Sequence, residues 1–168
     1  MGHRANFVVI KDGSATAFQD QWAAMGCTYD FACGVEQSME ALKEYTETTE
    51  LMDWAFAEAG YLIDFDSRLA IAFGVPHCAE DLFDAGDDDP DFEELKAAED
   101  PSVAKLHEGD HLGFLEGIAA GWKGWKIAWD DRGVDAFAEH LKQKGISGIE
   151  TVPASHPPDT VPAVLHQA

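Results

Sequence analysis

YLIDFDSRLAIAFG, residues 61–74, is the most strand-like run of the chain, and it has a turn at its middle. Apolar residues lead into Asp66 and Ser67, and Leu69, Ile71 and Phe73 follow the turn at every second position. Residues of one parity on a strand face the same side of a sheet. We therefore predict a central β-hairpin, with one side of each strand facing a core.

A second hairpin is predicted near the start of the chain, between Ala5 and Trp22. The apolar run ANFVVI, residues 5–10, is followed by Lys11, Asp12 and Gly13, and then by a second strand-like run. Glycine supplies the positive φ that a tight turn needs, so Asp-Gly between two such runs favours a hairpin.

Three further segments carry periodic patterns. Apolar side chains recur at helical spacing over residues 35–60, which predicts one long helix or two joined helices, with a possible break at the threonine-rich residues 46–49. Residues 125–129 alternate Trp, Ile and Trp with Lys and Ala, as a strand with one aromatic face does. Residues 134–144 form an amphipathic pattern that ends at Gly145, which predicts a helix.

This order of elements indicates an α+β domain. We expect a mostly antiparallel sheet built from the two hairpins and the Trp-rich strand, covered on one side by three or four helices. Residues 1–152 are predicted to form this single domain. The Pro-rich residues 153–168 are predicted to form a flexible tail that does not pack.

The length and the cysteine content limit the classes of protein to which this chain can belong. A chain of 168 residues can bury a core of its own without disulfides or metal. Its three cysteines have no zinc-finger spacing, and the sequence opens without a leader, so a reducing, cytoplasmic location is expected. No apolar run is long enough to cross a bilayer. The sequence indicates no cofactor and leaves the oligomeric state open.

The net charge of −21 is the most pronounced global property, and it is unevenly distributed. Residues 79–100 carry −10, whereas residues 1–78 carry −8 and residues 101–168 carry −3. Such a field repels nucleic acid and anionic membranes and attracts basic proteins or cations. Direct binding to nucleic acid or membrane is therefore excluded, and a basic protein partner is expected.

The acidic run is the predicted partner-binding site. Carboxylates steer a basic partner toward the surface, and an interleaved aromatic residue supplies an anchor. The residues assigned to this site are Asp84, Asp87, Asp88, Asp89, Asp91, Phe92, Glu93 and Glu94. A calcium loop beginning at Asp87 is excluded, because Phe92 occupies the position that requires glycine. A solvated acidic loop without a partner remains the alternative.

A zinc site is the second candidate. His107, Glu108 and His111 match the His-Glu-x-x-His pattern of zinc metalloproteases, in which two histidines on one helical face bind zinc and the glutamate activates water. Gly109 and Asp110 lie where that helix must be continuous, and both are poor helix formers. A catalytic metal is therefore kept only as the alternative, and no catalytic residue is assigned.

Two short stretches resemble motifs of small bacterial proteins that have no established activity. They are residues 3–8, HRANFV, and residues 124–129, GWKIAW. The resemblance implies a bacterial, cytoplasmic origin and no particular function.

The sequence thus favours a non-enzymatic acidic binding protein, specifically an immunity protein or inhibitor that neutralises a basic enzyme such as a nuclease toxin. Two alternatives stay open. One is a zinc-dependent hydrolase that uses the motif at His107. The other is an ordinary domain whose acidity reflects adaptation to high salt.

Overall fold

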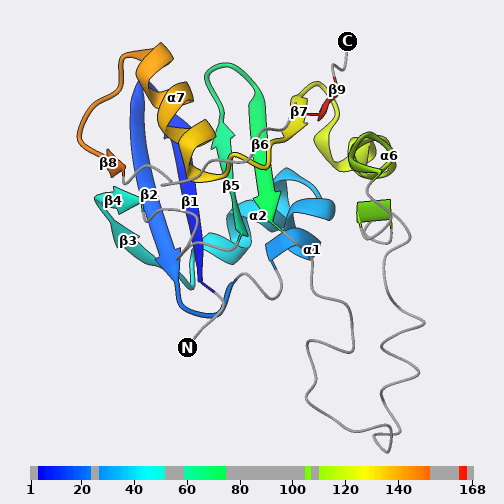
Figure 1. The fold of residues 1–168 in the computed structure, drawn as a ribbon, viewed down its shortest axis with the longest axis horizontal. Coiled ribbons are helices and arrows are strands. Elements are labelled where there is room, and N and C mark those ends of the chain that lie inside the picture. Colours follow the sequence, from blue (N-terminus) through cyan, green and yellow to red (C-terminus); the bar gives the residue numbers. More distant parts are fainter. Residues whose placement is uncertain are drawn as a thin grey trace, which may run out of the picture.

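A seven-stranded sheet organises the computed structural model, which describes residues 4–23, 27–51, 59–74, 105–106, 110–151 and 163–165 (Figure 1). The strands lie in the order β3-β2-β1-β5-β6-β7-β9. Four of the six neighbouring pairs are antiparallel, and the pairs β1–β5 and β6–β7 are parallel. The predicted α+β fold with a mostly antiparallel sheet is confirmed.

The predicted central hairpin is confirmed at the middle of this sheet. Strands β5 (Ala59–Asp64) and β6 (Leu69–Gly74) pair antiparallel, with Asp64 opposite Leu69. Every residue of β5 is buried. Tyr61 and Ile63 pack on one face and Leu62 on the other, so the strand is apolar on both sides because both faces are covered.

The first hairpin is also confirmed, as β1 (Ala5–Lys11) and β2 (Ser14–Asp20). Strand β1 pairs parallel with β5, so the two hairpins lie side by side in one sheet. Parallel neighbours need a long crossover, and part of it consists of helices α1 (Cys27–Ala32) and α2 (Val35–Leu42).

The predicted helix over residues 35–60 is wrong for residues 43–51 and 59–60, which are not helical. The chain leaves the helix after Leu42, and Thr46–Thr48 form β3, an edge strand paired antiparallel with β2. Threonine is β-branched and suits a strand better than a helix. Glu50–Leu51 form β4, which pairs with β8 (Glu150–Thr151) in a separate two-stranded sheet. Residues 52–58 lie outside the described residues.

The other edge of the main sheet holds the Trp-rich strand β7 (Lys126–Trp129) and β9 (Ala163–Leu165). Strand β7 pairs parallel with β6, and β9 pairs antiparallel with β7. Residues 163–165 belong to the segment predicted as an unpacked tail, and for these three residues the structure differs from the prediction. The rest of residues 153–168 lies outside the described part of the chain.

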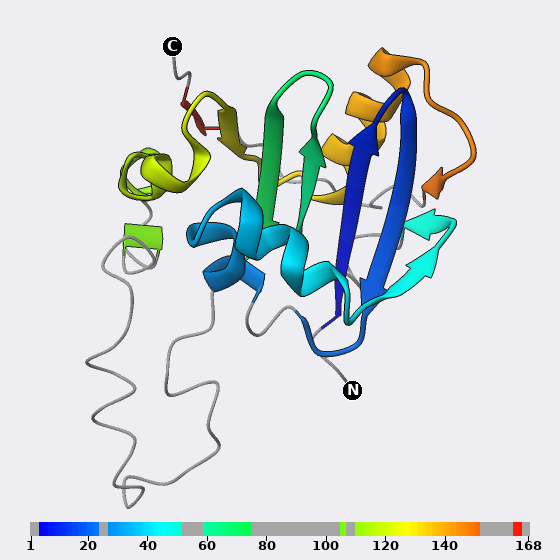
Figure 2. The same cartoon turned by 180° about the vertical axis from the view of Figure 1, so that it is seen from behind.

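Helices cover both faces of the sheet, and the prediction of cover on one side is wrong. Helices α1, α2, α6 (His111–Ile118) and the 3-10 turn η2 (Ala119–Trp122) pack into one core cluster. Helix α7 (Val134–Lys144), whose bounds match the prediction, packs on the opposite face (Figures 1 and 2). The alternating side chains of β7 contribute to the core on both faces of the sheet. Ile127 and Trp129 belong to the first cluster, and Ala128 belongs to the cluster under α7.

The tryptophans near β7 are core residues. Trp122, Trp125 and Trp129 are each at most 8% exposed. The indole N–H of Trp122 donates to the carbonyl oxygen of Phe31 at 2.8 Å, which ties η2 to α1. Among the described residues, no helix has the length and apolar character that crossing a bilayer requires.

Candidate functional site

The carboxylate of Asp64, at the end of β5, is completely buried. Its Oδ1 accepts hydrogen bonds from the backbone N–H groups of Asp66 at 2.9 Å and Ser67 at 3.1 Å. Its Oδ2 lies 2.8 Å from Nε2 of His140 and 3.1 Å from Nζ of Lys144. A buried charge is tolerated only when it is paired and hydrogen-bonded, and here both oxygens are engaged.

The surroundings of Asp64 keep it ionised. Burial alone would raise the pKa of Asp64, but the hydrogen bonds from His140, Ser67 and Lys144 outweigh it and hold that pKa below its usual range. An ionised carboxylate only accepts hydrogen bonds, so Nε2 of His140 carries the hydrogen of the shared bond.

Helix α7 supplies both side-chain donors from one face. His140 and Lys144 are four residues apart, the spacing that places two side chains one above the other on a helix. The ammonium group of Lys144 also donates to Oγ of Ser67 at 2.7 Å. The last turn of α7 is thereby attached to the turn of the central hairpin.

The turn of the central hairpin is also hydrogen-bonded to the turn of the first hairpin. The carboxylate of Asp66 accepts from the backbone N–H groups of Asp12 at 2.9 Å and Gly13 at 2.8 Å. Asp12 and Gly13 both have positive φ, 53° and 73°, as expected for a tight β1–β2 turn. The two hairpin turns and the end of α7 therefore form one hydrogen-bonded unit.

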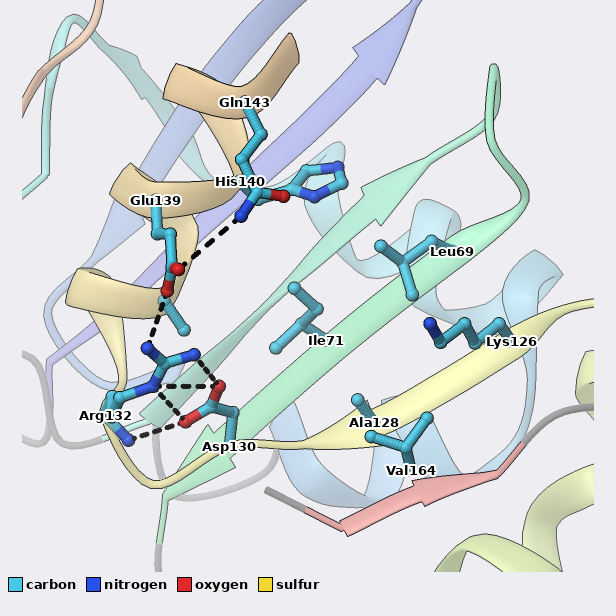
Figure 3. A pocket seen from close by; sticks show the side chains of 11 residues that line it. Leu69, Ile71, Lys126, Ala128, Asp130, Arg132, Glu139, His140, Gln143 and Val164 are labelled. Atoms are coloured by element: carbon cyan, nitrogen blue, oxygen red, sulfur yellow. Dashed lines mark hydrogen bonds and ion pairs between the residues drawn. The ribbon is translucent and has the colours of Figure 1, made fainter. Parts of the chain in front are cut away.

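A pocket of about 190 Å³ opens beside this unit, between α7 and strands β6, β7 and β9 (Figure 3). Its apolar wall comes from the sheet, with Leu69, Ile71, Ala128 and Val164. Its polar wall comes mainly from α7 and from the turn before it, and it consists of Asp130, Arg132, Glu139, His140 and Gln143, with Lys126 opposite.

Arg132 in this pocket is bound by two carboxylates. Its guanidinium reaches Asp130 at 2.7 Å and Glu139 at 2.6 Å. These partners, Asp130 foremost, raise the pKa of Arg132 above its usual value. Asp130 is itself buried and also accepts the backbone N–H of Arg132, so the arrangement fixes the turn that leads into α7.

The Asp64–His140 pair has the geometry of two members of a catalytic triad, but its surroundings favour a structural role. The pocket lining in the described chain includes no Ser, Thr or Cys that His140 could activate. Ser67 contacts Lys144, which also lies 3.1 Å from the carboxylate of Asp64, and Ser67 has no contact with His140 among the described interactions. The cluster can lock the two hairpins and α7 together, and we assign it no reaction.

The predicted partner-binding residues are not placed by the structure. The whole acidic stretch from Glu80 to Asp100 lies outside the described residues, and so does Phe92. Its assignment as a docking site stays a prediction.

The alternative zinc site is placed only in part, because His107 and Glu108 lie outside the described residues. His111 is the first residue of α6, and its ring lies 5.8 Å from that of Trp129. Asp110 has φ −92° and ψ 75°, and its side chain accepts the N–H of Gly113 at 2.9 Å as an N-cap. A zinc-binding helix needs helical backbone at Asp110, so this geometry argues against the motif. Within the described ranges, no three His, Cys, Asp or Glu side chains gather around a possible metal position.

The Asp64–His140–Lys144 cluster was missed from the sequence, although two signals for it are present. Asp64 is the one acidic residue among the apolar positions of a strand that is buried on both faces. His140 and Lys144 share a helical face with apolar neighbours. Neither signal specifies the other partner, because 76 residues separate Asp64 from His140.

Comparison with known proteins gives no further assignment, since no protein family model, no curated protein and no solved structure matches the chain.

Proposed function

We propose that this chain is a non-enzymatic binding protein that docks a basic protein through its acidic segment, residues 79–100. The most specific form of the proposal is an immunity protein or inhibitor that neutralises a basic enzyme, such as a nuclease toxin, by covering its substrate groove. The observation that carries it is the concentration of charge, since these residues contribute −10 of the net −21.

The distribution of charge along the sequence supports a localised function for this segment. Residues 79–100 contain 11 Asp and Glu and one lysine. The rest of the chain contains 21 Asp and Glu and 10 Lys and Arg. Adaptation to high salt would distribute carboxylates over the whole surface, so this distribution favours a dedicated acidic segment.

The chemistry of such a partner follows from electrostatics. A nuclease groove is lined by Lys and Arg that bind phosphates, and a dense row of carboxylates can occupy the same positions. The long-range field accelerates association, while an aromatic anchor such as Phe92 slows dissociation when it inserts into the partner. Nucleic acid itself is repelled by this surface.

Capture experiments with the intact chain test the proposal. The wild-type chain is immobilised and exposed to proteins of its native organism, beside a variant that loses four charges from the acidic segment. That variant carries Asp87→Asn, Asp88→Asn, Asp89→Asn and Asp91→Asn. A control loses four exposed charges spread over the described surface, through Asp12→Asn, Glu44→Gln, Glu116→Gln and Glu150→Gln.

We expect a basic protein to be retained by the wild type and the control, and to be lost from the acidic-segment variant. If the captured protein is an enzyme, an equimolar amount of the chain should abolish its activity. Recovery of no basic protein, or equal recovery with the acidic-segment variant, contradicts the proposal. Retention of a basic enzyme whose activity is unchanged contradicts its inhibitor form.

A further inference from the structure

An open apolar groove lies on the face of the sheet that carries α1 and α2, at a distance in sequence from the acidic segment. It has a volume of about 500 Å³ and lies between α2 and strands β1 and β2. Val9, Phe18 and Met39 line it and are half-buried, and Leu42 is buried beside them.

Among the described residues, the helical layer on this face is narrower than the sheet, which leaves the groove open. Helix α2 ends at Leu42, close to β1. Strands β2 and β3 lie farther out, toward the edge of the sheet (Figure 2). Phe7 of β1 is completely buried and stacks on Tyr45, with ring centroids 4.7 Å apart. Phe18 is its register partner on β2, yet it remains half-buried.

The rim of the groove is acidic. Glu36 and Glu40 come from α2 and Glu47 comes from β3, and all three are exposed. Lys43 is the basic residue of this lining, and its ammonium lies 2.7 Å from the carboxylate of Glu40. Within the part of the chain that the structure describes, Glu36 and Glu47 form no ion pair, and they place two negative charges beside apolar side chains.

We propose that this groove docks a cationic amphipathic segment of a partner protein. An apolar side chain of the segment enters between Phe18 and Met39, and flanking Lys or Arg residues pair with Glu36 and Glu47. Burial of the apolar side chain supplies affinity, and the charges select a basic sequence. Anionic occupants are rejected, which excludes nucleic acid, anionic lipid and the chain's own acidic segment.

This inference rests on the proposed function, because it takes the partner to be basic, and it adds a second contact surface. It predicts that apolar residues contribute to recognition at the groove, whereas simple attraction to a chain of charge −21 needs charge alone.

A synthetic peptide of about 14 residues, with Leu on one helical face and Lys on the other, serves as the probe. Titration into the intact, isotope-labelled chain should shift the backbone NMR signals of Val9, Phe18 and Met39. A peptide of equal charge with Ser in place of Leu should bind at least tenfold more weakly and leave these signals unchanged.

Two variants test whether the peptide binds in the groove. Met39→Lys puts a positive charge in the apolar wall, and the pair Glu36→Gln with Glu47→Gln removes the rim charge while leaving the apolar wall intact. Each should weaken peptide binding about tenfold, whereas the control pair Glu116→Gln with Glu150→Gln should change it less than twofold. The variant with Glu36→Gln and Glu47→Gln, called the rim pair, keeps the test valid if Met39→Lys fails to fold. Unchanged affinity in the rim pair, or shifts confined to other surfaces, overturns the inference.

The acidic-segment variant separates this inference from the proposed function. With Asp87, Asp88, Asp89 and Asp91 replaced by Asn, the peptide should still shift the groove signals. If it does while no basic protein is captured by the wild type, the groove inference stands and the proposed function fails. If a basic protein is captured but the peptide leaves the groove signals unchanged, the proposed function stands and the groove inference fails.

Discussion

At the residue scale, Asp64 connects the turn of the central hairpin to helix α7, which is distant from it in sequence. Its two oxygens engage the hairpin turn through Asp66 and Ser67 and helix α7 through His140 and Lys144. A buried charge with this many donors is costly to disturb, because removing either carboxylate oxygen leaves some of those donors without an acceptor.

Asp64→Asn should lower the free energy of unfolding by about 3 kcal/mol, because it removes the negative charge from beside Lys144 and places an amide N–H among donors. Urea unfolding followed by circular dichroism measures this change. Glu116→Gln, at an exposed position, should change it by less than about 0.5 kcal/mol. Equal effects of the two substitutions would show that Asp64 has no special role in stability.

The pH dependence of the same comparison follows from the lowered pKa of Asp64. Since the pKa of Asp64 is lower in the folded state, the stabilisation of the fold by its charge is complete at pH values above the unfolded-state pKa of about 3.9. This stabilisation is lost as the pH falls through the folded-state pKa. The stability difference between wild type and Asp64→Asn should therefore be constant near pH 6 and should shrink below about pH 4. A difference that persists unchanged at pH 2 would contradict an ionised Asp64.

At the scale of elements, close backbone contact joins the α1–α2 layer to η2. Gly34, between α1 and α2, has φ 108°, and a Cβ placed there would lie 2.7 Å from the carbonyl oxygen of Gly121. The indole N–H of Trp122 donates to the carbonyl oxygen of Phe31 beside this contact. A side chain at position 34 would force the two elements apart.

Gly34→Ala should therefore destabilise the fold by about 3 kcal/mol or more, from both backbone strain and the clash with Gly121. Gly145 provides a matched control, since it also has positive φ, 70°, but a Cβ there meets no atom within 4 Å. Gly145→Ala should cost only about 1 kcal/mol. Thermal unfolding of both variants measures the difference, and equal losses would exclude a tight contact at Gly34.

Elements with local signals could be predicted from the sequence, and those that depend on distant partners could not. The Asp-Gly turn, the alternation around residues 61–74 and the pattern of residues 134–144 each specify an element within a short window. Strand β3 forms because Thr48 pairs with Ala17 of β2, and β9 forms because Val164 pairs with Ala128 of β7. For segments of only three residues, such pairings with distant strands, more than the local sequence, decide whether a strand forms.

The helical cover on both faces was missed for a similar reason. Both strands of the central hairpin are apolar on both sides, as buried strands are, but the alternating residues at 69, 71 and 73 suggested one buried face. Among the candidate sites, the sequence identified the acidic segment through composition alone. The local signals at Asp64 and at His140 with Lys144 do not indicate that these residues meet, and nothing in the sequence indicates the groove beside α2, because both sites form only when separate elements come together.

At the scale of the whole molecule, negative charge is unevenly divided between the scaffold and one segment. The chain outside residues 79–100 holds ten of the eleven Lys and Arg residues, whereas residues 79–100 hold eleven acids and one lysine. Charge density, rather than total charge, should therefore decide binding to a basic partner. Salt should weaken that binding by slowing association.

The most direct test of this central claim is calorimetric titration of the captured basic partner with three forms of the chain: wild type, the acidic-segment variant and the control with four scattered neutralisations. The two variants have the same net charge. We predict that the acidic-segment variant binds at least tenfold more weakly than the control, which should remain within about threefold of wild type. Equal affinities for the two variants would show that only net charge matters, and would contradict a docking site in residues 79–100.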